Sequence, residues 1–331
     1  MKSNVILVLS HAEVSQLLPL DECIQVMREA FIALASGEVH LPLRSIIRPP
    51  QAKGVLGLMP SYVSGERPAY GLKAVCVFPG NPAIGKDAHQ GAVLLFSGET
   101  GELQAVMNAS AITAIRTAAA TAVASDLLAR KDADSLAIIG SGVQARTHLL
   151  AMAEVRELKH CRVASRDFEH AKKFANEMKH QVSFAVEPVQ TVAQACEPAD
   201  LIVTTTTARA PIVKREWIKP GSHLNLVGAC VPNAREADGE TMAAASLFVD
   251  SRESALNEAG DYILAAQEGL IGPEHIRAEL GEVLSGAKPG RSSADEITCF
   301  KSLGISVEDL FAANYLYRKA QRLKLGTWVD Y

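Results

Sequence analysis

The feature that most constrains this fold is an alternation of short apolar runs with helical segments between residues 135 and 252. The apolar runs predict strands at residues 135–139, 160–165, 183–186, 200–204, 223–227 and 246–250. Helical periodicity fits residues 143–156, 168–179 and 191–196 between the earlier runs. Such β–α alternation predicts an α/β fold, with a doubly wound parallel sheet covered by helices on both faces.

A glycine-rich turn joins the first predicted strand to the first predicted helix, in "SLAIIGSGVQARTHLL", residues 135–150. In a Rossmann-type domain, Gly140 permits the tight turn, Gly142 lets the backbone approach a pyrophosphate, and Ala145 allows close packing of helix on strand. The phosphates would lie at the positive N-terminus of the helix. A glycine turn that binds no nucleotide is the alternative, because the motif alone is weakly specific.

The end of the second predicted strand bears on the choice of cofactor. The sequence "VASRDFEHAKK", residues 163–173, has Ser165 where an acidic residue would bind the ribose 2′-hydroxyl, followed by Arg166. An arginine and a hydroxyl suit a 2′-phosphate, so NADPH is favoured over NADH. The alternative is that Arg166 is solvated and Asp167 binds the ribose.

Composition and charge exclude several classes of partner. The 33 basic and 37 acidic residues are mixed along the chain and give a net charge of −4, so we expect a small-molecule partner and neither nucleic acid nor membrane. The Ala-rich stretch 110–128 contains Arg116 and Asp126, which favours a buried core helix. Six cysteines without a C-x-x-C pair indicate a cytoplasmic protein, and the spacing of the histidines predicts no metal site.

The first 125 residues have a different pattern. A helix is expected at residues 20–36, strands are expected at 71–78 and 92–97, and residues 81–91 are loop-like. A further helix is expected in the tail at residues 306–322. This part of the chain therefore predicts an α+β domain.

Several short motifs occur in an order that resembles the ornithine cyclodeaminase/mu-crystallin family. They are "LPLRSII" (41–47), "LMPSY" (58–62), "GLKAV" (71–75), "AITAIRTAAATA" (111–122), "IIGSGVQAR" (138–146) and "CFKSLG" (299–304). The resemblance implies a substrate-binding and dimerisation domain from residues 1–124 and 303–331, a dinucleotide-binding Rossmann domain from 125–302, and a homodimer. It implies a nicotinamide cofactor and chemistry on amino acids or their imines.

The resemblance assigns roles to three basic residues. Arg44 and Arg116 match arginines that bind the substrate carboxylate, which suits a planar guanidinium. Lys73 matches an active-site lysine, whose pKa burial can lower towards that of a useful proton donor. The alternatives are a structural ion pair for Arg116, a surface position for Arg44 and the wet face of an edge strand for Lys73.

Further residues match the cofactor side of the family's site. His89 and Gln90 match a pair that lies near the cofactor in mu-crystallin-like members. The positions expected to line the dinucleotide are Thr117, Val143, Gln144, Thr205, Val227 and Lys301.

One departure from the family's pattern bears on the reaction. Ornithine cyclodeaminases resemble "VGGDCPG" where this chain has "VGACVPN", so Cys230 replaces the aspartate proposed as their base. A thiol is a poor base near neutral pH, and Cys230 is either catalytic or only packed. Glu258 matches a substrate-side acid.

The sequence therefore predicts an NADPH-dependent reductase of imine or ketimine carboxylates such as 1-pyrroline-2-carboxylate or 1-piperideine-2-carboxylate. The alternatives are an alanine-dehydrogenase-like enzyme, an acyclic (iminosuccinate-like) imine reductase, an ornithine cyclodeaminase, and a crystallin-like protein that binds ligands and retains NADPH.

Overall fold

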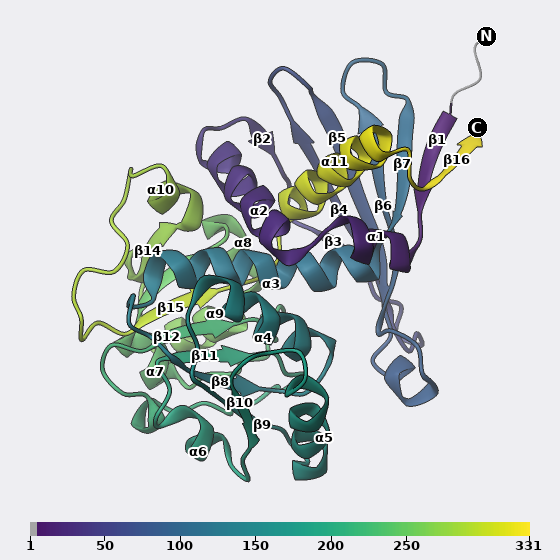
Figure 1. Cartoon of the computed structure of the whole chain (residues 1–331). Coiled ribbons are helices and arrows are strands. Elements are labelled where there is room, and N and C mark those ends of the chain that lie inside the picture. Colours follow the sequence, from purple (N-terminus) through teal and green to yellow (C-terminus); the bar gives the residue numbers. More distant parts are fainter. Residues whose placement is uncertain (1–4) are drawn as a thin grey trace. The chain divides into compact units, whose positions relative to one another are not determined.

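The computed structural model describes residues 5–331, which form two compact units (Figure 1). Unit 1 comprises the chain up to Arg116 together with Ile305–Tyr331, and unit 2 comprises Thr117–Gly304. The first division falls inside a continuous helix, α3 (Ala109–Leu128), between Arg116 and Thr117, whereas the sequence placed it between residues 124 and 125. A helix offers no loop that would mark such a boundary in a sequence.

Unit 1 is built on an eight-stranded sheet with the order β16-β1-β7-β6-β5-β4-β2, in which β3 also pairs with β4. Only β1 and β7 are parallel, and the other neighbours are antiparallel. The strands are β1 (Val5–Leu9), β2 (Val39–His40), β3 (Ser45–Ile47), β4 (Val55–Val63), β5 (Ala69–Val77), β6 (His89–Ser97), β7 (Leu103–Asn108) and β16 (Thr327–Asp330).

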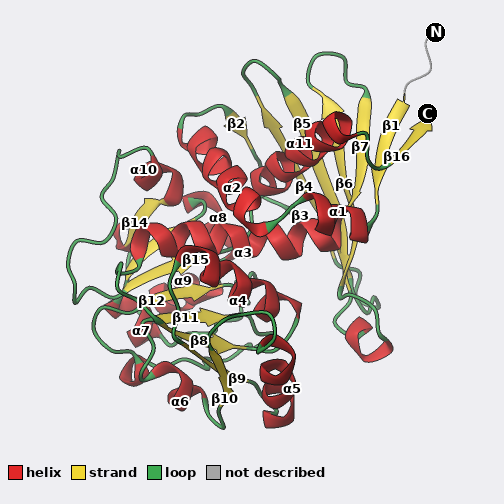
Figure 2. Ribbon diagram, viewed as in Figure 1, coloured by secondary structure: helices red, strands yellow, loops and turns green. Residues whose placement is uncertain are grey.

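Two helices, α2 (Leu20–Ala35) and α11 (Ser306–Leu323), pack on one another, and α11 packs on β4, β5 and β6 (Figure 2). Strand β5 alternates buried and half-exposed residues as a sheet covered on one face requires, and Lys73 lies on the buried side. The remaining helices are α1 (His11–Leu17) and the 3₁₀ turn η1 (Asn81–Ile84). Residues 81–91 are therefore not one loop, because they contain η1 and the start of β6.

Unit 2 is built on an eight-stranded parallel sheet with the order β10-β9-β8-β11-β12-β15-β13-β14. The strand order reverses between β8 and β11, which is where such sheets bind ligands at their carboxyl edge. The strands are β8 (Ser135–Ile139), β9 (His160–Ala164), β10 (Ala185–Pro188), β11 (Leu201–Thr204), β12 (His223–Leu226), β13 (Ser246–Val249), β14 (Ile276–Glu279) and β15 (Thr298–Lys301).

Both faces of the unit 2 sheet are buried, since Leu136, Ala137, Ile138 and Ile139 of β8 are each at most 2% exposed. Strand β8 contacts α4 and α6. The helices are α4 (Val143–Val155), α5 (Phe168–Met178), α6 (Val192–Cys196), α7 (Gly239–Ala244), α8 (Arg252–Glu258), α9 (Gly260–Gln267) and α10 (Leu280–Leu284), with 3₁₀ turns η2 (Arg215–Trp217) and η3 (Pro273–His275).

The predicted fold class, a Rossmann-type sheet domain beside an α+β domain, is confirmed. The six predicted strands of unit 2 are present, with ends displaced by at most a few residues. The sequence missed β14, β15 and the short helices after residue 238. Helix α3 is long and apolar enough to span a membrane by composition, but 72% of that window is buried inside the protein, as expected of a core helix.

Candidate functional site

The turn after β8 requires glycine at its first position. Gly140 has φ 122°, in the region that side chains rarely adopt, and a Cβ there would lie 2.7 Å from Thr205 Oγ1. The loops after β8 and β11 therefore touch at the point where the strand order reverses. This close approach brings together Gly140 and Thr205, two residues predicted to belong to one site.

The N-terminus of α4 is suited to bind an anion. Its N-cap, Gly142, has no side chain to accept the first helical N–H groups, and no protein atom lies within 4 Å of where its Cβ would be. Gly142 and Val143 are exposed, and Gln144 follows them in the first turn. Free N–H groups and the helix dipole favour phosphate at this position, so the residues present fit a dinucleotide.

The end of β9 distinguishes the two candidate ribose ligands. The Asp167 carboxylate caps α5 by accepting a hydrogen bond of 2.9 Å from the Glu169 N–H, so it serves the helix. Arg166 is exposed, and the Ser165 hydroxyl lies 3.0 Å from that of Ser141 in the glycine loop. Ser165 and Arg166 thus border the loop that is expected to hold the phosphates.

The remaining predicted cofactor residues of unit 2 occupy several positions. Val227 follows β12 and donates its N–H to the Thr204 carbonyl, and Lys301 ends β15, so both lie at the carboxyl edge of the sheet. Lys301 is fully buried and forms an ion pair of 2.9 Å with Asp261. Thr117 is a buried residue of α3, the first residue of unit 2.

Unit 1 contains a buried cluster of charged side chains around Lys73. The Lys73 Nζ lies 2.6 Å from Asp309 Oδ2, and the other oxygen of Asp309 accepts a hydrogen bond of 3.0 Å from Arg116 Nε. Arg116 Nη1 donates a hydrogen bond of 2.7 Å to Glu308. All four side chains are at most 4% exposed. Strand β5, helix α3 and helix α11 thus meet at one cluster, and Lys73 does not lie on a wet face.

The environment prepares Lys73 for proton transfer. Burial and the positive charge of Arg116 lower its pKa to about 8, although Asp309 opposes the shift, and Arg44 lowers it further. Burial, Lys73 and Arg116 likewise lower the pKa of His89, which begins β6. An amine with a pKa near neutral pH can give up a proton readily.

Arg116 stays charged within this cluster. Burial opposes its charge, but the carboxylates of Asp309 and Glu308 outweigh burial and raise its pKa. Burial would raise the pKa of Asp309, but the positive charges of Arg116 and Lys73 outweigh burial and lower it. Arg44 adds a further positive charge close enough to lower the pKa of Lys73. Positive side chains that converge on a buried site favour an anionic ligand such as a carboxylate.

The other two predicted catalytic residues belong to unit 2. Cys230 is half-buried after β12, and its thiol lies 3.4 Å from the Val227 carbonyl. Glu258 is half-buried at the end of α8. The structure therefore gathers Arg44, Lys73 and Arg116 in unit 1, with Cys230 and Glu258 in the other unit.

Among the buried carboxylates that the sequence did not single out, four bear on the two clusters of the candidate site. Glu308 and Asp309 stand in the first turn of α11, where acids are expected simply because of the helix dipole. Glu236 and Asp261 are fully buried in unit 2. For Glu236 and Asp261, the available signal in the sequence was closeness to predicted site residues. Asp261 stands in "GD" shortly after Glu258, and Glu236 stands in "RE" shortly after Cys230.

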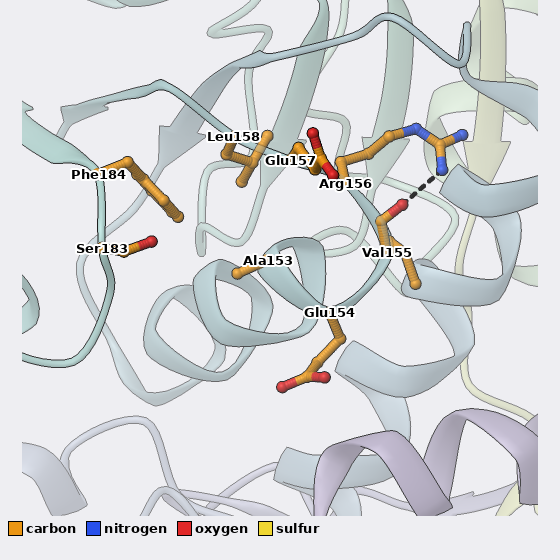
Figure 3. Close-up of a pocket in the computed structure, with 8 residues that line it drawn as sticks. All are labelled: Ala153, Glu154, Val155, Arg156, Glu157, Leu158, Ser183 and Phe184. Atoms are coloured by element: carbon orange, nitrogen blue, oxygen red, sulfur yellow. Dashed lines mark hydrogen bonds between the residues drawn. The ribbon is translucent and has the colours of Figure 1, made fainter.

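A hollow of about 500 Å³ lies at the opposite, amino edge of the unit 2 sheet (Figure 3). It is lined by residues 153–158, Ser183 and Phe184, which precede β9 and β10. The Arg156 guanidinium points away from Phe184 and donates to carbonyls, including that of Val155. This hollow is therefore not the dinucleotide site. Among residues 5–331, no group of His, Cys, Asp and Glu side chains is arranged to hold a metal.

A glycine loop at the point where a parallel sheet reverses its order, together with a buried lysine whose pKa is near neutral, defines an oxidoreductase that uses a nicotinamide dinucleotide. Within that class, the chain belongs to the ornithine cyclodeaminase/mu-crystallin family, whose model matches residues 4–324. The resemblance recognised in the sequence is thus confirmed.

Individual relatives cover most or all of the chain. The mouse ketimine reductase mu-crystallin is 43% identical over 281 residues, 85% of each chain. The Thermococcus litoralis Δ1-pyrroline-2-carboxylate reductase, solved with NADH and L-proline, has a TM-score of 0.94 and 41% identity, covering 97% of this chain and 99% of that one. An archaeal alanine dehydrogenase dimer with bound NAD has a TM-score of 0.92 and 34% identity, covering 99% of each.

Proposed function

We propose that this protein is an NADPH-dependent reductase that converts cyclic ketimine carboxylates, such as 1-pyrroline-2-carboxylate or 1-piperideine-2-carboxylate, to amino acids. The observation that carries the proposal is the buried cluster of unit 1, where the Lys73 amine, with a pKa of about 8, and the Arg116 guanidinium are held on the two oxygens of Asp309. The relatives named as ketimine and pyrroline-2-carboxylate reductases support it.

In this proposal unit 1 is the substrate-binding domain and unit 2 binds the dinucleotide. Arg44 and Arg116 bind the substrate carboxylate, and Lys73 donates a proton to the imine nitrogen. When bound, the dinucleotide supplies the hydride that reduces the iminium carbon. Asp309 holds Lys73 and Arg116 in register, because its two oxygens contact one cation each. Glu258 serves as a substrate-side acid.

The dinucleotide is assigned to the carboxyl edge of unit 2. Gly140, Gly142, Val143, Gln144, Thr205 and Val227 line it, with Thr117, His89 and Lys301 as further cofactor residues. We propose NADPH over NADH because Arg166 is exposed at the end of β9 while Asp167 is engaged in capping α5. The named relatives were solved with NADH and NAD, so the preference rests on these residues of this chain.

Reduction of a 2-oxo acid with ammonia is the second candidate, and the likeness to an archaeal alanine dehydrogenase favours it. Cyclodeamination of ornithine is disfavoured because Cys230 offers a thiol in place of a carboxylate base. None of the six cysteines, all within residues 5–331, forms a disulfide, which suits a cytoplasmic protein.

We propose that the protein is a homodimer formed through the sheet of unit 1. Tyr62 and Tyr70 pair across β4 and β5 with ring centroids 4.7 Å apart, on the face opposite Lys73. Leu72 and Leu94 pair on that same face and are half-exposed. A second copy would cover this apolar face, as the dimeric archaeal relative supports.

The test follows NADPH oxidation with each cyclic imine and, separately, with 2-oxo acids plus ammonia, while ammonia release from ornithine is measured alongside. We expect reduction of a cyclic imine without added ammonia and no ammonia from ornithine. Lys73→Ala should lower kcat by about 10²-fold or more while the NADPH dissociation constant stays unchanged. Turnover of ornithine to proline without imine reduction would overturn the proposal.

A further inference from the structure

We propose that Glu236, held in place by Asp261 and Lys301, is a positioning residue that fixes the two loops after β11 and β12 against which the dinucleotide binds. The inference rests on the proposed dinucleotide site of unit 2. It assigns a role to two buried acids that the sequence did not single out, and it adds a positioning role for Lys301 to its proposed place among the cofactor residues.

Glu236 joins the two loops through both oxygens of its carboxylate. Its Oε1 accepts hydrogen bonds from the Thr206 N–H, at 2.8 Å, and from the Thr206 hydroxyl, at 2.7 Å. Its Oε2 accepts hydrogen bonds from the Thr204 hydroxyl, at 2.7 Å, and from the Gly228 N–H, at 2.6 Å. Four donors from two loops therefore converge on one side chain that is fully buried.

The loops are packed so closely that this arrangement has little freedom. A Cβ on Gly228 would lie 2.1 Å from the Thr206 carbonyl oxygen and 2.5 Å from Glu236 Oε1. Thr205 stands between the two threonines that bind Glu236 and is the residue that touches the Gly140 turn. The carboxylate of Glu236 thus fixes the position of Thr205 relative to the Gly140 turn, at the point where the strand order reverses.

A second layer fixes Glu236 itself. Asp261 Oδ1 accepts hydrogen bonds from the backbone N–H groups of Glu236, at 2.7 Å, and Ala237, at 3.0 Å, and Asp261 Oδ2 pairs with Lys301 at 2.9 Å. Gly260 brings Asp261 this close, because a Cβ there would lie 1.9 Å from the Ala234 carbonyl oxygen. Lys301 is anchored in β15, an interior strand of the sheet that pairs with β12 and β13.

The charge of Glu236 is costly at this position. Burial raises the pKa of Glu236, and Lys301 offsets part of that cost. Because well-packed apolar residues can often replace buried ion pairs without loss of stability, we infer that these charges are present for the geometry that they impose. The geometry imposed here is that of the carboxyl edge of the sheet.

The chain offers a matched control at the amino end of β11, the strand whose carboxyl end binds Glu236 through Thr204. Asp200 immediately precedes β11 and is also mostly buried, with hydrogen bonds from the Ser135 hydroxyl at 2.6 Å and from Arg130 at 2.8 Å. It lies at the amino edge of the sheet, away from the glycine loop. Asp200→Asn therefore disturbs a comparable carboxylate at the amino end of β11 without touching the proposed loops.

The experiment compares Glu236→Gln with Asp200→Asn in the full chain. The new amide nitrogen must face one of the two backbone donors, of Thr206 or Gly228, so one loop loses its acceptor. We measure the dissociation constants of NADPH and NADH by fluorescence and the melting temperature of each apo variant. The proposal predicts about a tenfold or greater weakening of dinucleotide binding by Glu236→Gln, and a dissociation constant within about twofold of the wild type for Asp200→Asn.

A second variant, Thr206→Val, removes a single hydroxyl from the same arrangement and serves if Glu236→Gln does not fold. It should weaken dinucleotide binding about threefold to tenfold. Unchanged dinucleotide binding in the folded variants, or equal weakening by Asp200→Asn, would overturn this inference and leave the proposed function standing. A wild-type protein that binds neither dinucleotide would overturn both, so the two failures are distinguishable.

Discussion

The carboxylate of Asp309 offers the sharpest test of the proposed catalytic cluster. Asp309→Asn removes the negative charge that lies 2.6 Å from Lys73 and 3.0 Å from Arg116, with little change in volume. Lys73 then keeps the effects that lower its pKa, namely burial and the charges of Arg116 and Arg44, and loses the one that raises it. Its proton should therefore be lost at lower pH than in the wild type.

The size of the effect follows from the contact that is lost. A charge-assisted hydrogen bond contributes about 1.5–3 kcal/mol, which corresponds to a displacement of about one to two pH units in the alkaline limb of the activity profile. With the wild-type pKa at about 8, Lys73 is about three-quarters protonated at pH 7.5. In the variant, a displacement of about 1.5 pH units, the middle of this range, leaves about one-tenth of Lys73 protonated at the same pH. The lost protonation should thus lower kcat/KM of the variant about eightfold at pH 7.5. At pH 5.5 Lys73 is mostly protonated in both proteins, so any remaining difference in kcat/KM does not come from its titration.

The assay is kcat/KM for imine reduction at saturating NADPH between pH 5.5 and 9.5. The ratio of wild type to variant is plotted at each pH, so that titration of the substrate cancels. Glu308→Gln is the control, because Glu308 accepts a hydrogen bond from Arg116, whereas Asp309 is the carboxylate that raises the pKa of Lys73. Glu308→Gln should raise KM, and its ratio of wild-type to variant kcat/KM should be the same at every pH. A flat ratio for Asp309→Asn as well would refute the role assigned to Lys73.

Three further outcomes are expected. Arg166→Ala should narrow the preference for NADPH over NADH by about 1.5–3 kcal/mol, measured as the ratio of the two dissociation constants, and equal constants in the wild type would count against a 2′-phosphate site. Tyr70→Asp, at a side chain 50% exposed on the apolar sheet face, should turn a dimer into a monomer of 35.3 kDa in light scattering, whereas a wild-type monomer would remove the proposed dimer. Burial lowers the pKa of His148 to about 4 and of His223 to about 3 from 6.5. The stability that these neutral side chains contribute above pH 6.5 should therefore be lost as the pH falls towards those values, seen as a falling melting temperature. His148→Gln should make this fall in melting temperature less steep.

The sequence by itself determined the architecture of unit 2 and the position of the glycine loop. Strand β8, the turn at Gly140 and helix α4 follow from local signals, because alternation of strand and helix and the backbone freedom of glycine are read over a few neighbouring residues. The motif order also identified the family. Strand β15 escaped prediction because its four residues, TCFK, have a polar residue at each end and so form no clear apolar run.

Only the tertiary structure decided which charges meet. Asp309 is 193 residues from Arg116 and binds it within a buried cluster. Glu236 accepts hydrogen bonds from Thr204 and Gly228, and nothing in the sequence around Glu236 indicates these partners. In the sequence, Asp309 has the features of an ordinary acid in the first turn of a helix. The pKa of a buried lysine depends on desolvation and on charges a few ångströms away, and both are set by long-range packing rather than by neighbours along the chain.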